Sequence, residues 1–80
     1  MLEFPENIDV WALFKNGTAL PYFFFWKGRK IKIDKINLVH ATRDGLTIFY
    51  HFSVSAGGNF YRLAFDSAGL KWLLEAIDSD

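Results

Sequence analysis

The sequence predicts a small all-β domain, an antiparallel meander of about six short strands. Turn dipeptides that favour positive φ recur along the chain, and the runs between them are rich in β-branched and aromatic residues. Short runs of this kind, separated by such turns at intervals of about ten residues, are typical of an all-β meander. The turn dipeptides are Asn16-Gly17, Lys27-Gly28, Asp44-Gly45 and Gly57-Gly58.

Alternating apolar residues predict a first strand over residues 8–14 and a second over residues 20–26, both partly apolar on both faces. In the second strand, one face is expected to hold Leu20, Tyr22, Phe24 and Trp26, and the other Phe23 and Phe25. Pro21 cannot donate to a backbone ladder, so it is expected at the start of its strand or on a sheet edge.

A third strand is expected over residues 29–36, because Ile31 and Ile33 alternate with charged residues. Ile36 breaks this parity, and a bulge or turn near Asp34-Lys35 would restore the register. Residues 46–55 show the strongest alternation in the chain, and residues 59–65 are expected to pair with them across the glycine turn.

The last segment, residues 68–77, fits two patterns. One set of apolar residues has helical spacing, whereas an overlapping set alternates, and Gly69 is awkward in a first helical turn. A strand is favoured, and a short helix is the alternative. Closure of exposed edges then favours a twisted sheet or an SH3-like or partly open barrel.

Composition restricts the classes of function. The 80 residues suffice for a single domain, residues 1–80, and the absence of cysteine excludes disulfides and thiolate metal sites. Two histidines, His40 and His51, are too few for a dedicated zinc site unless carboxylates join them, and no metal or cofactor is expected. The longest apolar run is too short to span a membrane and the start lacks a signal-peptide pattern, so a cytoplasmic protein is expected.

The formal net charge is zero, which argues against strong non-specific binding to nucleic acid or to a membrane surface. The charges are nevertheless unevenly distributed. Residues 27–35 carry five of the nine basic residues and one acid, Asp34. The ends of the chain are acidic, with Glu3, Glu6 and Asp9 at one and Glu75, Asp78 and Asp80 at the other.

No catalytic residue is predicted, and the chain is not expected to be an enzyme. His51, Ser53 and Ser55 share one strand face, but i and i+2 residues of a strand lie about 6.5–7 Å apart, too far for direct proton transfer. The acidic residues cluster at termini and turns, and Gly57-Gly58 lacks the sequence of a phosphate-binding loop.

Aromatic and basic residues of the second and third strands are the candidate binding residues. They are Phe23, Phe25, Trp26, Lys27, Arg29, Lys30 and Lys32. A protein partner or a second copy of the chain is the preferred ligand, because the excess aromatics of this region, or Trp11 and Leu13, would form an exposed patch. Single-stranded DNA is the alternative, since single-strand binders combine cations with exposed rings. These residues also have a purely structural explanation, in which the lysines lie on a sheet edge and deter aggregation while the rings belong to the core.

Three motifs of the chain resemble a little-characterised bacterial family of short β-rich domains. They are Gly17 and Pro21 followed by Phe25-Trp26-Lys27-Gly28-Arg29, then Tyr61-Arg62-Leu63, then Trp72-Leu73-Leu74-Glu75. The chain departs from the family pattern in the wider spacing of Gly17 and Pro21. Some members are encoded near error-prone DNA-polymerase components. The resemblance therefore implies a final strand and an accessory role around DNA, with no assigned activity.

Overall fold

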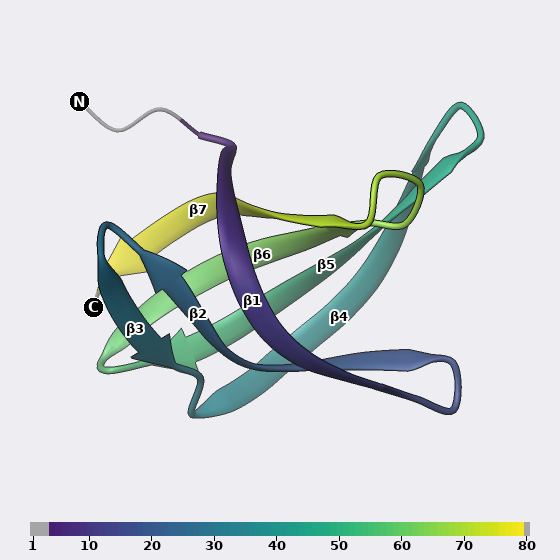
Figure 1. Cartoon of the computed structure of the whole chain (residues 1–80). Coiled ribbons are helices and arrows are strands. Elements are labelled where there is room, and N and C mark those ends of the chain that lie inside the picture. Colours follow the sequence, from purple (N-terminus) through teal and green to yellow (C-terminus); the bar gives the residue numbers. More distant parts are fainter. Residues whose placement is uncertain (1–3, 80) are drawn as a thin grey trace.

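The chain forms a single curled sheet of antiparallel strands, shown in Figure 1. The computed structural model describes residues 4–79, with the backbone alone at Ser79; the acidic residues Glu3 and Asp80 lie outside this range. Within it there are seven strands and no helix. The strands are β1 (Glu6–Lys15), β2 (Thr18–Trp26), β3 (Arg29–Lys32), β4 (Lys35–Asp44), β5 (Thr47–Ala56), β6 (Asn59–Asp66) and β7 (Lys71–Ser79).

The expected all-β fold is confirmed, and three of its turns lie at the expected dipeptides Asn16-Gly17, Lys27-Gly28 and Gly57-Gly58. The β4–β5 turn is Gly45-Leu46, one residue later than expected, and the β6–β7 turn at residues 67–70 has no such dipeptide. Asn16 and Gly17 have φ of 52° and 77°, and Lys27 and Gly28 have φ of 52° and 72°. Two successive positive φ angles characterise the type I′ turn, whose twist matches that of the adjoining strands. These two turns therefore join β1 to β2 and β2 to β3 as tight hairpins.

The expected third strand is divided between opposite ends of the sheet. The strand order is β3-β2-β1-β7-β6-β5-β4, so β3 and β4 are the two edges although they follow each other in the chain. The Ile33 N–H donates to the Tyr22 carbonyl, and the next N–H, of Asp34, donates to the Ser55 carbonyl, both at 2.8 Å. The irregularity expected near Asp34-Lys35 is thus the point where the chain passes from one edge to the other.

The sequence pattern did not predict most of β4. Its only partly buried residue is Ile36, and the remainder of the strand is exposed. A strand with so little burial shows no apolar alternation, although it pairs with β5 over its whole length except at a bulge between Ile36 and Leu38.

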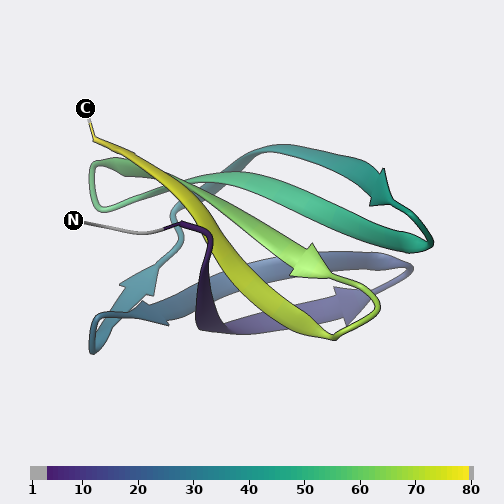
Figure 2. The ribbon, with the colours of Figure 1, turned by 90° about the horizontal axis from the view of Figure 1, so that it is seen from above.

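The curled sheet forms a half-barrel that is closed at one end and open at the other. At the closed end, Ile33 and Asp34 connect its two edges. Elsewhere the edges separate, because β3 has four residues and pairs with β2 only from Phe23 to Trp26, whereas β4 has ten. Figure 2 shows the result as two layers, with β4 and β5 lying over β1 and β2.

The core lies between these layers. Phe24 and Ile31, from β2 and β3, face buried residues of the other layer, and the Phe24 ring meets Tyr61 edge-on at 5.1 Å. The largest fully buried side chains are Phe24, Phe52, Leu63, Leu74 and Val54. Each such side chain contributes about 1.5–3 kcal/mol of burial free energy, which is a large share for a domain this small.

The last segment is a strand, as favoured, and the helical alternative is wrong. β7 pairs with β6 along its length and with β1 near its start, and these contacts bury Trp72 and Leu74. A turn held by Asp66 precedes it, because the Asp66 Oδ1 accepts hydrogen bonds from the backbone N–H groups of Ala68 and Gly69, both at 2.9 Å. In the described part of the chain, no helix meets the length and apolarity needed to cross a membrane.

Candidate functional site

Two rows of side chains cross β1, β2 and β3 on the outer side of the sheet. Directly paired residues of antiparallel strands point to the same face, and alternate residues point to opposite faces. Because Phe24 is fully buried, its neighbours in β2 point outward. The two rows, which we call the outer face, are Asp9–Phe25–Lys30 and Trp11–Phe23–Lys32.

The rings of the outer face contact one another. Trp11 and Phe23 stack with centroids 5.9 Å apart and planes at 2°, and Phe25 meets Phe23 edge-on at 5.7 Å. The Lys30 Nζ lies 4.2 Å from the Phe23 ring centroid, a cation–π contact. Trp11 is 63% exposed and Phe25 46% exposed. Phe23 is thus enclosed by its neighbours, while the rings on either side of it remain open to solvent.

A β-bulge extends the apolar part of this face. Trp11 pairs with Phe23 but Ala12 pairs with Pro21, which leaves Tyr22 as the extra residue of β2. Because of the extra residue, the β2 residues before Tyr22 point to the opposite faces from those that simple alternation with Phe24 predicts. The expectation that Leu20 shares a face with Phe24 is therefore wrong.

The reversal places Leu20 beside Leu13, its partner on β1, and both are exposed. Pro21 faces inward and is buried. Pro21 also lies beyond the part of β2 that β3 covers, which agrees with its expected edge position.

Three of the seven predicted binding residues lie apart from the outer face, at the β2–β3 turn. Trp26 is on the inner side, packed against the core, and its indole N–H donates to the Glu6 carboxylate. Lys27 lies over the same ring, with its Nζ 5.2 Å from the centroid. Arg29 pairs with Trp26 and is exposed. The structure therefore brings together Phe23, Phe25, Lys30 and Lys32, and groups the other three around the indole.

The cations of this region have no carboxylate partner among the described residues, where both ion pairs belong to Glu75. Lys27, Arg29, Lys30 and Lys32 are all exposed, and Asp9 is the one acid in the two rows. This corner of the sheet therefore carries a local positive charge that the zero net charge of the chain conceals.

Trp11 is the residue of this face that the set predicted from β2 and β3 omitted. Alternation predicts that Trp11 shares with Leu13 the face opposite Val10 and Ala12, and this pair is expected as a patch separate from Phe23 and Phe25. The Asn16-Gly17 turn alone would oppose Trp11 to Tyr22, and the bulge at Tyr22, which the sequence pattern did not predict, sets Trp11 beside Phe23 instead.

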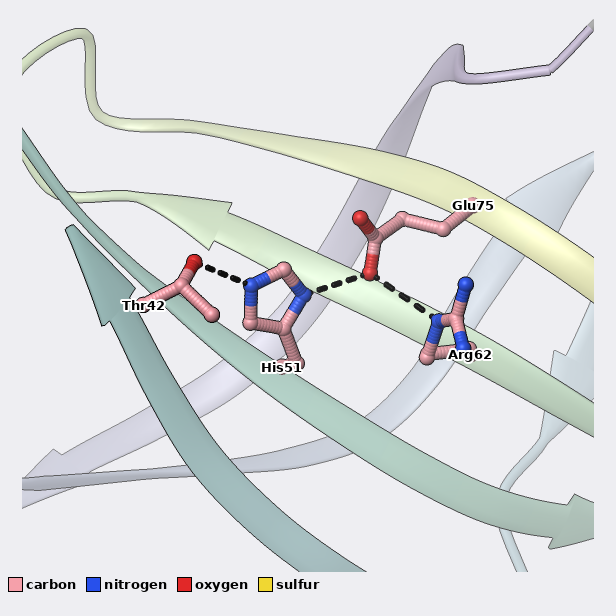
Figure 3. A network of polar contacts seen from close by, with 4 residues as sticks. All are labelled: Thr42, His51, Arg62 and Glu75. Carbon is pink, nitrogen blue, oxygen red and sulfur yellow. Dashed lines mark hydrogen bonds and ion pairs between the residues drawn. The ribbon is translucent and has the colours of Figure 1, made fainter. Parts of the chain in front are cut away.

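A second cluster, of polar residues, lies on the outer side of β4 to β7 and is drawn in Figure 3. The Thr42 Oγ1 lies 2.7 Å from the His51 Nε2, and the His51 Nδ1 lies 2.6 Å from the Glu75 Oε1. Arg62 contacts the same carboxylate oxygen at 3.4 Å, and the His40 ring stacks on His51 at 4.7 Å. Glu75, which contacts both His51 and Arg62, is the extra residue at a bulge of β7.

The order hydroxyl, imidazole, carboxylate is the one used in nucleophilic catalysis. Neither described cavity is lined by Thr42, His51 or Glu75. Sequence reasoning grouped His51 with Ser53 and Ser55 on its own strand and missed its actual partners, because these come from β4 and β7.

A cavity of about 390 Å³, which we call the mouth cavity, opens where the half-barrel is not closed. Phe14, Tyr50, Phe52 and Phe65 form its apolar walls, and residues 15–19 of the β1–β2 hairpin form its rim. Phe52 and Phe65 are buried, whereas Phe14 is 58% exposed and touches Phe65 at a centroid distance of 5.3 Å.

Together, these features define a small antiparallel half-barrel with an exposed aromatic and basic face. Comparison with known proteins found no matching family model, no similar curated protein and no similar solved structure.

Proposed function

We propose that this protein is a non-enzymatic binding module that holds a partner protein on its outer face. The observation that carries the proposal is the exposed ring cluster of Trp11, Phe23 and Phe25, continued along the same side by Leu13 and Leu20. Large exposed apolar patches mark interaction sites, and interface centres are enriched in aromatic residues. The leucines favour a protein ligand, since they offer nothing to a phosphate or a base.

The rim of this face indicates what the partner carries. Lys30 and Lys32 end the two rows, and no carboxylate of the described residues neutralises them. A partner surface with an apolar centre and carboxylates on one side would match both the rings and the lysines of the outer face. The rings already contact one another, so little side-chain entropy would be lost when the partner binds.

Serine substitutions on the outer face test this proposal. Affinity capture from a cell extract should retain the partner with the wild-type chain and lose it with Trp11→Ser or Phe25→Ser. Leu46→Ser is the matched control, because Leu46 is 98% exposed but lies in the β4–β5 turn. A partner lost equally with Leu46→Ser would contradict the proposal.

Self-association is one form of the same proposal. Light scattering over a concentration series should then show an increase in mass that Phe25→Ser abolishes. A strictly monomeric wild-type chain would limit the ligand to other proteins.

Single-stranded DNA is a second candidate, favoured by one observation: each aromatic row ends in a lysine, so rings and cations lie side by side. Such a platform could stack bases and neutralise phosphates. Binding of a short oligothymidine should weaken steeply with salt and move the amide signals of Arg29, Lys30 and Lys32 in NMR spectra. Unchanged spectra at moderate salt would exclude this candidate without affecting the protein-binding proposal.

A further inference from the structure

We propose that β4 pairs with the β4 strand of a second copy of the chain, so that two half-barrels share one continuous sheet. This interface is separate from the outer face, which lies on β1, β2 and β3. In the described part of the chain, β4 is an edge strand that pairs on one side only, with β5. An unpaired edge presents backbone donors and acceptors that another strand can satisfy.

The two edges of the sheet differ in how well they resist such pairing. β3 has four residues, and Lys30 and Lys32 are among them. Short length and lysine side chains are both common protections of an edge. β4 has ten residues and no proline, and from Leu38 to Thr42 it contains no lysine, arginine or carboxylate. Leu38 and Val39 are 58% and 50% exposed. The middle of β4 is therefore an unprotected edge.

Every second residue of β4 directs its backbone N–H and C=O away from β5. The Ile48 carbonyl accepts from the N–H of Ser67, which follows β6 on the other side of β5. Ile48 therefore directs its backbone groups away from β4, and its partner Arg43 directs its own away from β5. The same alternation applies to Ala41 and Val39. The groups of these three β4 residues are those that a further strand would meet.

One antiparallel register joins two copies along the whole strand. With His40 opposite the His40 of the second copy, a two-fold axis passes between them. Val39 then lies opposite Ala41, so that the backbone groups directed away from β5 meet one another. Leu38 lies opposite Thr42, and both are exposed in the single chain. The same pairs recur on the other side of the axis because the two copies are identical.

The charges at the ends of β4 match in this register. Asn37 is the extra residue at the bulge between β4 and β5. If it stays extra in the new pairing, Lys35 lies opposite Asp44 of the second copy. Counted from the buried Phe52 and Val54, both charged side chains point away from the core, so they meet on the same side of the sheet. A shift of the axis by one residue in either direction leaves both charges unmatched.

Sedimentation equilibrium over a concentration series, up to millimolar chain, tests the proposal and should show a monomer–dimer transition. Ala41→Pro should weaken the dimer at least about tenfold, because it removes a donor that β5 does not use and two-fold symmetry doubles the loss. Ala41→Ser keeps the N–H and is the matched control, which should dimerise like the wild-type chain. Circular dichroism would verify that the proline variant folds.

Charge reversal tests the register. Lys35→Glu and Asp44→Lys should each weaken the dimer several-fold, and the double variant should recover the wild-type affinity because the reversed charges attract again. The two residues lie about 30 Å apart along one strand, so such a rescue requires a second copy. Amide exchange at Val39, Ala41 and Arg43 should also slow as the protein concentration rises.

Four results would overturn the proposal. They are the mass of one chain throughout the series, a double variant no better than the single ones, amide exchange of β4 that does not depend on concentration, and a dimer that Phe25→Ser abolishes while Ala41→Pro preserves it. The last would assign self-association to the outer face. A monomeric chain would leave the binding of other proteins to the outer face unaffected.

Discussion

At the scale of the residue, three consecutive phenylalanines show how orientation alone decides a role. Phe24 is fully buried and contacts Tyr61, while Phe23 and Phe25 lie on the outer side. The three side chains are chemically identical, so their division between core and surface follows from strand alternation and from which side of the sheet faces the other layer.

This division predicts unequal costs for the same substitution. Phe24→Ala should lower the free energy of unfolding by about 3–5 kcal/mol, the usual cost of emptying a buried phenylalanine site. Phe25→Ala should cost about 1 kcal/mol or less, because the ring is 46% exposed and loses one edge-on contact. Urea unfolding followed by circular dichroism would measure both; should Phe24→Ala not fold, Phe24→Leu supplies the comparison. Equal losses for the two positions would contradict the burial assigned to them.

Glu75 is the second residue whose role depends on its partners. Its carboxylate accepts from His51 and lies beside Arg62, and the His51 and Glu75 side chains are 13% and 22% exposed. Glu75→Ala would leave the half-buried imidazole without this partner. We expect a loss of about 1–2 kcal/mol in the free energy of unfolding at pH 7, near the lower end of the range for hydrogen bonds to charged groups because both side chains keep some contact with solvent. The neighbouring Asp78→Ala, at an exposed position of the same strand, should change stability little, and a similar loss there would argue against the cluster.

At the scale of the element, the hairpins are determined by their turns. Both the β1–β2 and the β2–β3 turns combine a positive-φ residue with a positive-φ glycine. The β2–β3 turn matters most for the outer face, because it sets the register that opposes Phe23 to Lys32 and Phe25 to Lys30.

Substitution of Gly28 tests this dependence without altering packing. A Cβ at Gly28 would meet no atom within 4 Å, so Gly28→Ala changes only the conformational preference at a φ of 72°. A loss of about 1 kcal/mol in the free energy of unfolding is expected from the strained backbone. Gly28→Asn should restore part of it, since asparagine tolerates this region. If the Gly28→Ala variant had the same free energy of unfolding as the wild-type chain, the turn assigned to Lys27-Gly28 would be incorrect.

At the scale of the whole molecule, the two edges of the sheet meet at only one end. Asp34 contributes twice to this junction: its N–H donates to the Ser55 carbonyl, and its Oδ2 accepts from the Gly57 N–H at 3.0 Å. The carboxylate therefore connects the crossing between β3 and β4 to the β5–β6 turn. The opposite end stays open, and the mouth cavity lies there.

Removal of this carboxylate should loosen the closed end. Asp34→Ala is expected to lower the free energy of unfolding by about 1 kcal/mol, the usual net value of a hydrogen bond. Amide exchange at Gly57 should accelerate, while exchange in the β1–β2 hairpin should not. Asp44→Ala, at the exposed last residue of β4, provides the control. Unchanged exchange at Gly57 would show that the side chain does not hold the junction.

The sequence by itself determined the fold class, the positions of three hairpin turns and the irregularity near Asp34, because turn chemistry and alternation are local properties. It also identified the aromatic and basic residues of β2 and β3. Only the tertiary structure decided that the bulge at Tyr22 turns Leu20 outward, that Trp11 joins Phe23, and that Trp26, on the face of Phe24 as alternation predicted, donates to Glu6. These depend on strand register and on the curl of the sheet, which bring together residues that no local pattern connects.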